Sequence, residues 1–196
     1  EIPPEEVPLV QKMLIQKCNA LGKPVITATQ MLESMIKSPV PTRAEVSDIA
    51  NAIIDGTDAI MLSEETTLGD FPLEAVQMMT RVALRVEKDV YTTDTIAEYE
   101  NSYGVTDVVS QSAVLAAHEV DARVIVALTA SGRTARMVAR YRPAERIIAL
   151  TSSQTVANQL ILSFGCYPLV IPKLTSVEEI IPLVRTTALK EKIAAK

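Results

Sequence analysis

The sequence has no tryptophan, two cysteines and one histidine, and aromatic residues make up only 4% of its 196 residues. The core must therefore be built mainly from aliphatic side chains. Cys18 and Cys166 lie far apart and lack the spacing of a metal or redox motif, which favours structural thiols in a reducing, cytoplasmic compartment. A single histidine, His118, argues against a histidine-rich metal site and against a Ser-His-Asp triad.

The sequence also lacks an excess of positive charge and long hydrophobic runs. Its formal net charge is −5, which argues against non-specific binding to nucleic acid or to an anionic membrane. The longest apolar runs, such as residues 124–128, are far shorter than a membrane span, and no basic-then-apolar segment opens the chain. Because the first residue is Glu1 rather than methionine, we expect a piece of a longer protein.

Five short aliphatic runs predict strands. They are apolar throughout and do not alternate, which is typical of parallel strands covered on both faces. The runs are residues 24–29, 59–63, 123–129, 146–151 and 167–171. Helical segments lie between them, and two begin with capping-box spacing, at Thr42 with Glu45 and at Ser176 with Glu179. This alternation predicts an α/β fold with parallel sheets.

A polar stretch at residues 91–104 interrupts the alternation and predicts a domain boundary. Residues 1–90 hold 14 acidic and 8 basic residues, whereas residues 91–196 hold 10 acidic and 11 basic residues. The first part has only two predicted strands, too few for a sheet that is stable by itself. The second part has three predicted strands, which suit a small open sheet with flanking helices.

Two polar clusters follow the predicted strands of the first part. Thr29 comes at the end of one strand and could donate a hydrogen bond to a carboxylate or enolate oxygen; alternatively, it ends the strand by bonding to the backbone. Ser63 comes at the end of the next strand and would lie beside Thr29 if the strands are neighbours. Two hydroxyls there could relay a proton, although the position of Ser63, taken alone, favours a polar loop that leads to the next helix.

The segment 129–134 follows a strand and opens a helix in the second part. Free N–H groups at such a position bind anions, and a glycine there allows a phosphate to approach closely. Its candidate phosphate ligands are Thr129, Ser131, Gly132, Arg133 and Thr134. The segment lacks the first glycine and the lysine of a nucleotide P-loop, so it indicates a general phosphate site. Of the arginines that follow, we expect Arg140 on the solvated face of the helix.

Together these motifs resemble pyruvate kinase. The matching stretches include GKPV, ATQMLESM, PTRAE, DIANA, DAIMLS, GDFP, SGRTA and ARYRP. They lie within residues 1–12, 22–35, 41–45, 48–52, 58–63, 69–72, 131–135 and 139–143. The family often has glycine where this chain has Glu64, and some members have lysine where it has Ala130.

The resemblance implies a glycolytic kinase that moves phosphate between phosphoenolpyruvate and ADP, giving pyruvate and ATP. On that basis residues 1–90 are the last two βα units of a TIM barrel, and residues 91–196 are most of an α/β effector-binding domain. The resemblance further implies Mg²⁺ or Mn²⁺ and K⁺ as cofactors, with ligands upstream of Glu1, and a cytoplasmic homotetramer. The isolated chain is therefore expected to be inactive.

The resemblance also assigns roles to particular residues. Thr29 matches a threonine that contacts the substrate near the enolate, and Ser63 matches a serine near a proton relay. Arg43 matches an arginine that reaches toward the active site of a neighbouring subunit. The segment 129–134 matches a loop that binds the phosphate of an allosteric activator. The alternative is a stand-alone phosphate-binding regulatory module without catalysis.

Overall fold

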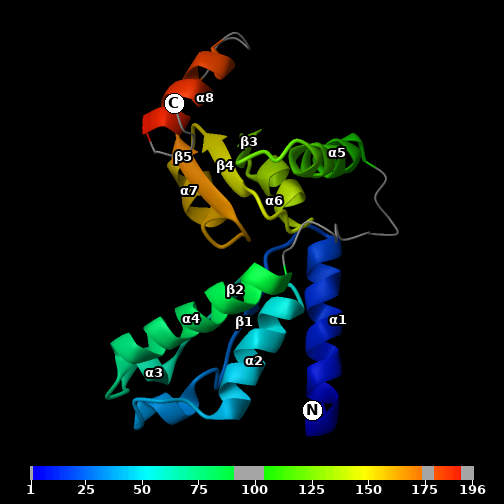
Figure 1. Ribbon diagram of the computed structural model, residues 1–196. Coiled ribbons are helices and arrows are strands. Elements are labelled where there is room, and N and C mark those ends of the chain that lie inside the picture. The colour runs from blue at the N-terminus through cyan, green and yellow to red at the C-terminus, as the bar shows by residue number, and fades with distance from the viewer. Residues whose placement is uncertain (1, 91–103, 174–178, 191–196) are drawn as a thin grey trace. The chain divides into compact units, whose positions relative to one another are not determined.

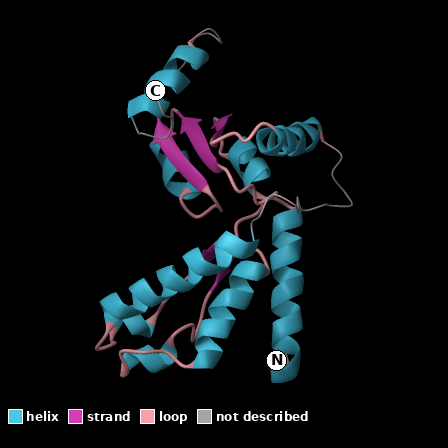
Figure 2. Cartoon of the chain, viewed as in Figure 1, coloured by secondary structure: helices cyan, strands magenta, loops and turns pink. Residues whose placement is uncertain are grey.

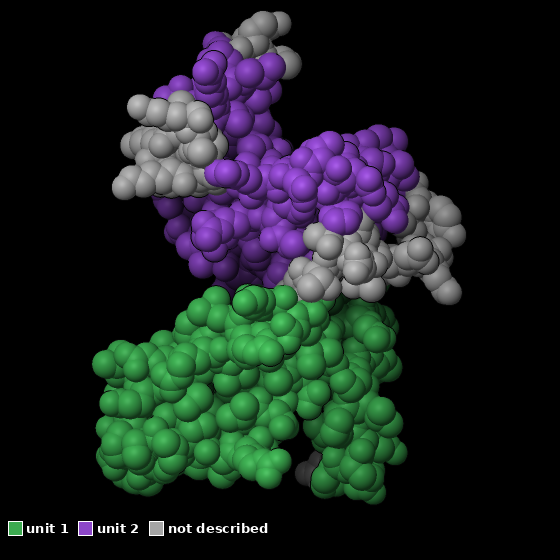
Figure 3. Space-filling model, in the orientation of Figure 1, with its two compact units in different colours: residues 1–92 green, residues 93–196 purple. Residues whose placement is uncertain are grey.

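The computed structural model describes residues 2–90, 104–173 and 179–190. The contacts within the chain divide it into two compact units, residues 1–92 and 93–196, which Figure 3 draws in different colours. Helices and strands alternate within each unit (Figure 2). Among the described residues, no helix is both long and apolar enough to cross a membrane.

The first unit contains two parallel strands, each followed by a helix (Figure 1). In chain order its elements are η1 (Pro4–Glu6), α1 (Val7–Ala20), β1 (Ile26–Thr27), η2 (Glu33–Ile36), α2 (Arg43–Ile54), β2 (Ala59–Ile60), α3 (Glu64–Thr67) and α4 (Pro72–Val90). Ile26 pairs with Ala59 and Thr27 pairs with Ile60. The ladder is shorter than the sequence predicts, but its parallel direction brings the carboxyl ends of both strands to one edge.

Local sequence signals account for where the helices begin and end. Helix α1 stops before Gly22, which has the left-handed φ of 62° that glycine adopts without a Cβ clash. The capping box predicted at Thr42 and Glu45 is present. Thr42 Oγ1 accepts from the Glu45 backbone N–H at 3.3 Å, while the Glu45 carboxylate accepts from the Thr42 N–H at 2.7 Å. Ser176, the first residue of the second predicted capping box, lies outside the described residues.

Helices α2 and α4 pack against each other and enclose the core of the first unit. That core is aliphatic and methionine-rich, as the scarcity of aromatics predicts. Its buried members are Met31, Leu32, Met35, Ile49, Ala52, Ile53, Ala75, Met79 and Val82. Three of these belong to the segment directly after β1, so burial of their side chains in the core holds that segment in place.

The second unit is a three-stranded parallel sheet in the order β3-β4-β5. Its elements are α5 (Val105–Glu119), β3 (Val124–Leu128), α6 (Arg133–Ala139), β4 (Arg146–Thr151), α7 (Gln154–Leu160), β5 (Cys166–Val170) and α8 (Ile180–Lys190). The strands match the predicted runs to within one or two residues at each end. The central strand, β4, is buried over Ile147–Thr151 as expected for a parallel strand between two neighbours.

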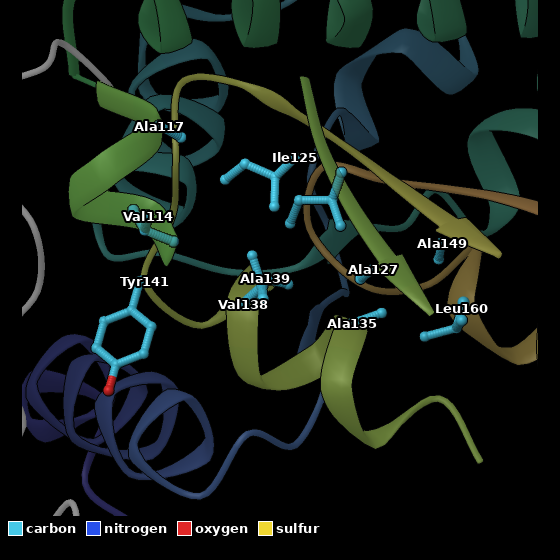
Figure 4. Close-up of a cluster of buried hydrophobic side chains, with 11 residues drawn as sticks. Val114, Ala117, Ile125, Ala127, Ala135, Val138, Ala139, Tyr141, Ala149 and Leu160 are labelled. Atoms are coloured by element: carbon cyan, nitrogen blue, oxygen red, sulfur yellow. The ribbon is translucent and has the colours of Figure 1, made fainter. Parts of the chain in front are cut away.

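Alternate residues of β4 face two separate hydrophobic clusters. Ile147 and Ala149 lie in the cluster shown in Figure 4, which α5, α6 and α7 complete. Ile148 and Leu150 lie in a second cluster to which α8 contributes. Helices therefore cover both faces of this sheet. Strand β5 departs from the prediction of full coverage, since its Tyr167 is 50% exposed.

The prediction that Arg140 lies on a solvated helix face is wrong. Its side chain is only 3% exposed and forms an ion pair with Asp107 on α5, at 3.2 Å. Arg140 also donates to the hydroxyl of Tyr141 at 2.9 Å. Helical spacing carries no information about Asp107, which lies 33 positions earlier in the chain. Pairing with this carboxylate offsets the free-energy cost of burying the guanidinium.

Candidate functional site

The structure brings Thr29 and Ser63 to the wall of one cavity of about 230 Å³. β1 and β2 are neighbours and run in parallel, so the loops that follow them meet at the same edge. The cavity is lined by Thr29, Gln30, Glu33, Ile36, Ser63, Glu64 and Glu65. The two hydroxyl residues that the sequence singles out therefore share one site, whose lining also includes three glutamates.

The backbone at the cavity wall is strained. Thr29 and Gln30 are consecutive non-glycine residues in the left-handed region, with φ of 82° and 55°. A β-branched residue such as threonine rarely adopts this conformation, which costs on the order of 1–3 kcal/mol. The burial of Met31 and Leu32, at 4% and 0% exposure, opposes relaxation of the turn. Such strain is typical of functional sites and aims the Thr29 side chain in a direction that an ordinary strand end would not give.

Glu65 joins the two loops, a role that the sequence gave no reason to expect. Its side chain is buried, with Oε1 accepting from the Leu32 N–H at 3.0 Å and Oε2 accepting from the Ser63 N–H at 2.8 Å. Burial opposes ionisation, but hydrogen bonds from its own, the Ser63 and the Leu32 backbone N–H groups outweigh burial and lower the pKa of Glu65. Glu65 is therefore ionised at neutral pH.

Glu45 is a second buried carboxylate, and it bonds to the segment that follows β1. It accepts from Ser34 N at 2.7 Å and Ser34 Oγ at 2.6 Å, in addition to its capping bonds with Thr42. Burial raises the pKa of Glu45, but the hydrogen bonds from Ser34 and Thr42 together lower it by more, so the net shift is downward. Capping-box spacing predicts the bond to Thr42, whereas the contact with Ser34 arises only from the tertiary fold.

The remaining sequence candidates of the first unit lie elsewhere. Arg43 is the first residue of α2; its side chain is exposed and does not line the cavity. Cys18 is a free, half-buried thiol. Within the described ranges, no three His, Cys, Asp or Glu side chains gather closely enough to hold a metal ion.

The loop at residues 129–134 joins β3 to α6 in the second unit. Gly132 is the N-cap of α6 and has a left-handed φ of 80°. Ser131, Arg133 and Thr134 are exposed, whereas Thr129 is buried and donates its N–H to the Leu150 carbonyl at 2.9 Å. The exposed groups could contact an anion at the surface of this loop, while Thr129 anchors the loop to the neighbouring strand.

Arg136 is a further cation at this loop. Its guanidinium donates to the Ser131 carbonyl at 3.3 Å, and a Cβ at position 132 would lie only 2.6 Å from Arg136 Nη1. The guanidinium therefore lies against the turn, and Gly132 leaves the space for it. Helical spacing alone placed Arg136 after the loop without indicating this contact.

The loop that follows β4 lies next to this one, because β3 and β4 are adjacent and parallel. Ser153 caps α7 by accepting from the Val156 N–H at 3.3 Å, and Thr151 accepts from the Ser153 N–H. The candidate phosphate ligands predicted from the sequence did not include this hydroxyl-rich neighbour. The signal was the run of Thr151, Ser152 and Ser153 at a strand end.

The fold and the cavity define a protein of two α/β parts with a polar site at the carboxyl ends of parallel strands. The family model described as pyruvate kinase, barrel domain, matches residues 1–76, and the one described as pyruvate kinase, alpha/beta domain, matches residues 107–196. The chain belongs to the pyruvate kinase family. Its fold is accordingly the last two βα units of a TIM barrel followed by a small open-sheet α/β domain, as the sequence predicts.

Individual relatives agree with this placement. The chain is 52% identical over 183 residues to a pyruvate kinase from Sporosarcina psychrophila and 49% identical over 192 residues to one from Geobacillus stearothermophilus. These matches cover 92% and 97% of the chain but 31% and 33% of the relatives. A solved pyruvate kinase structure from Cryptosporidium parvum matches the whole chain with a TM-score of 0.89 and 41% identity, over 41% of that structure. The chain thus spans about a third of the length of these relatives.

Proposed function

We propose that this chain forms part of a pyruvate kinase, an enzyme that transfers phosphate between phosphoenolpyruvate and ADP to give pyruvate and ATP in glycolysis. The observation that carries the proposal is the convergence of Thr29 and Ser63 on one cavity at the carboxyl ends of two paired barrel strands. Family membership supports the reaction, and the shared cavity supports roles for Thr29 in substrate binding and for Ser63 in proton relay.

The two hydroxyls have different roles in this proposal. Thr29 donates a hydrogen bond to the substrate oxygen on which negative charge develops as the phosphoryl group leaves. Its strained backbone fixes that donor before substrate binds, which is how a preorganised dipole favours a transition state. Ser63 orients the water that protonates the enolate carbon. The neighbouring Glu64 adds negative charge at the rim of the cavity.

The family also implies Mg²⁺ or Mn²⁺ and K⁺, which neutralise charge on the transferring phosphate when bound. Among the described residues, no three His, Cys, Asp or Glu side chains gather closely enough to hold a metal ion, so we assign no metal ligand and no metal-dependent step to this chain. We further propose that the full-length enzyme is a cytoplasmic homotetramer in which the exposed Arg43 reaches toward a neighbouring subunit.

We propose that residues 91–196 bind a phosphorylated allosteric effector through the loop at residues 129–134. Gly132 allows a phosphate to approach closely, while Arg133 and Arg136 place positive charge beside the hydroxyls of Ser131 and Thr134. None of these side chains is a general base in contact with a nucleophile. The loop is therefore expected to regulate the enzyme rather than to catalyse the reaction.

A coupled assay with phosphoenolpyruvate, ADP, Mg²⁺ and K⁺ tests the proposal. The full-length enzyme should form pyruvate, and the isolated 196-residue chain should not, because charge neutralisation by metal ions is essential for phosphoryl transfer. Turnover by the isolated chain would contradict the assignment of the essential cations to other parts of the enzyme. Effector binding by a full-length enzyme that makes no pyruvate would favour a regulatory module instead.

A further inference from the structure

Glu65 reaches from the start of α3 to both loops of the cavity. One carboxylate oxygen accepts from Leu32, three residues after Thr29, and the other accepts from Ser63 itself. The side chain is 2% exposed, so water cannot readily replace either bond. Without the carboxylate, two partly or fully buried N–H donors would lose their acceptor, which destabilises both loops.

The bond to Leu32 also stabilises the strained turn. Leu32 is the N-cap residue of η2, and its N–H donates to Glu65 at 3.0 Å. Glu65 therefore fixes the downstream end of the turn that holds Thr29 and Gln30 at positive φ. The same carboxylate fixes the backbone of Ser63 on the opposite loop.

We infer that Glu65 is a positioning residue for the proposed reaction: its carboxylate holds the loops after β1 and β2 together, so that Thr29 and Ser63 present their hydroxyls to one cavity. This inference rests on the proposed function. Both oxygens accept backbone hydrogen bonds, so Glu65 acts through the two loops and not as the proton donor. A misplacement of about 1 Å at a reacting group can cost a hundredfold in rate.

Glu45 provides a matched control. It is also a buried glutamate, it also bonds the segment that contains η2, and it also has a lowered pKa. Its partners, however, are Ser34 and Thr42, and neither lines the cavity. Replacing either glutamate by glutamine removes one acceptor oxygen and the charge, so both variants should lose stability. Only the Glu65 variant should disturb the placement of Thr29 and Ser63.

The test uses the full-length enzyme and three variants, Glu65→Gln, Glu45→Gln and Thr29→Val, with kcat and KM measured at a temperature where all are folded. Glu65→Gln should lower kcat about tenfold to a hundredfold with a smaller change in KM. Glu45→Gln should keep kcat within about twofold of wild type despite a lower melting temperature. Because Glu65 acts partly through Thr29 and partly through Ser63, adding Glu65→Gln to Thr29→Val should lower kcat less than it does in the wild type.

Equal losses of kcat in the two glutamine variants, or fully additive losses in the double variant, would show that Glu65 is merely structural. If Glu65→Gln does not fold, Glu65→Asp takes its place, since it keeps the charge but is one methylene too short to reach both loops; wild-type kcat in that variant overturns the inference. Amide hydrogen exchange supplies a readout independent of activity. The Leu32 and Ser63 amides should exchange faster in Glu65→Gln, and unchanged exchange contradicts the inference that Glu65 holds the two loops together. A wild-type enzyme that makes no pyruvate contradicts the proposed function instead.

Discussion

Replacing Gly132 by alanine should destabilise the second unit by about 2 kcal/mol. The backbone at this position has φ of 80°, and a left-handed conformation costs an L-residue roughly 1 kcal/mol or more. The added Cβ would also lie 2.6 Å from Arg136 Nη1 and 3.3 Å from Leu160 Cδ2. Arg136 can move, but only by giving up its bond to the Ser131 carbonyl, which adds about 0.5–1.5 kcal/mol.

Gly165→Ala is the matched control. Gly165 also has a left-handed φ, of 64°, but a Cβ there would meet only Ile147 Cδ1 at an ordinary 3.9 Å. This variant should lose only the backbone contribution, about 1 kcal/mol. The difference between the two alanine variants therefore isolates the crowding of Arg136 and Leu160 against the turn.

Native-state hydrogen exchange of the β4 amides in the full-length enzyme measures both effects. A loss of about 2 kcal/mol raises the opening constant roughly thirtyfold, and a loss of about 1 kcal/mol raises it roughly fivefold. Adding Arg136→Ala to Gly132→Ala should cost less than Arg136→Ala costs in the wild type, because the crowding is then relieved. Equal protection in the Gly132 and Gly165 variants would refute the argument that Gly132 makes room for Arg136.

Three further predictions concern the full-length enzyme. Thr29→Val should lower kcat by roughly tenfold to a thousandfold, more than it raises KM, because the lost donor acts where charge develops; unchanged kcat in a folded variant rules out that role. Arg133→Glu should weaken binding of a phosphorylated effector more than about tenfold in calorimetry, with the maximal rate near wild type, since a cation is replaced by a repelling anion. Glu45→Gln should reduce the acid sensitivity of the first unit. Because the pKa of Glu45 is lowered in the folded protein, its carboxylate stabilises the fold above about pH 4.5 and loses this effect as the pH falls through the folded-state pKa. Unfolding titrations of the wild type and the variant should therefore converge in acid.

The sequence by itself determined the alternation of helices and strands, the parallel direction of the sheets and the capping box of α2. These follow from local patterns: uninterrupted aliphatic runs, 3.6-residue spacing and a hydroxyl three residues before a glutamate. It also identified Thr29 and Ser63 as candidates, because polar residues after buried parallel strands lie at the edge where ligands bind.

Only the tertiary structure decided which charged residues are buried and which groups they bond to. Glu64 and Glu65 are adjacent, chemically identical and both line the cavity, yet Glu64 is exposed while Glu65 is buried and accepts from two backbone N–H groups. Arg140 has the spacing of a surface residue but pairs with Asp107 from another helix. A buried charge is stabilised by partners that are distant in the chain, so the fate of each such residue is set by the packing of several elements and not by its neighbours in sequence.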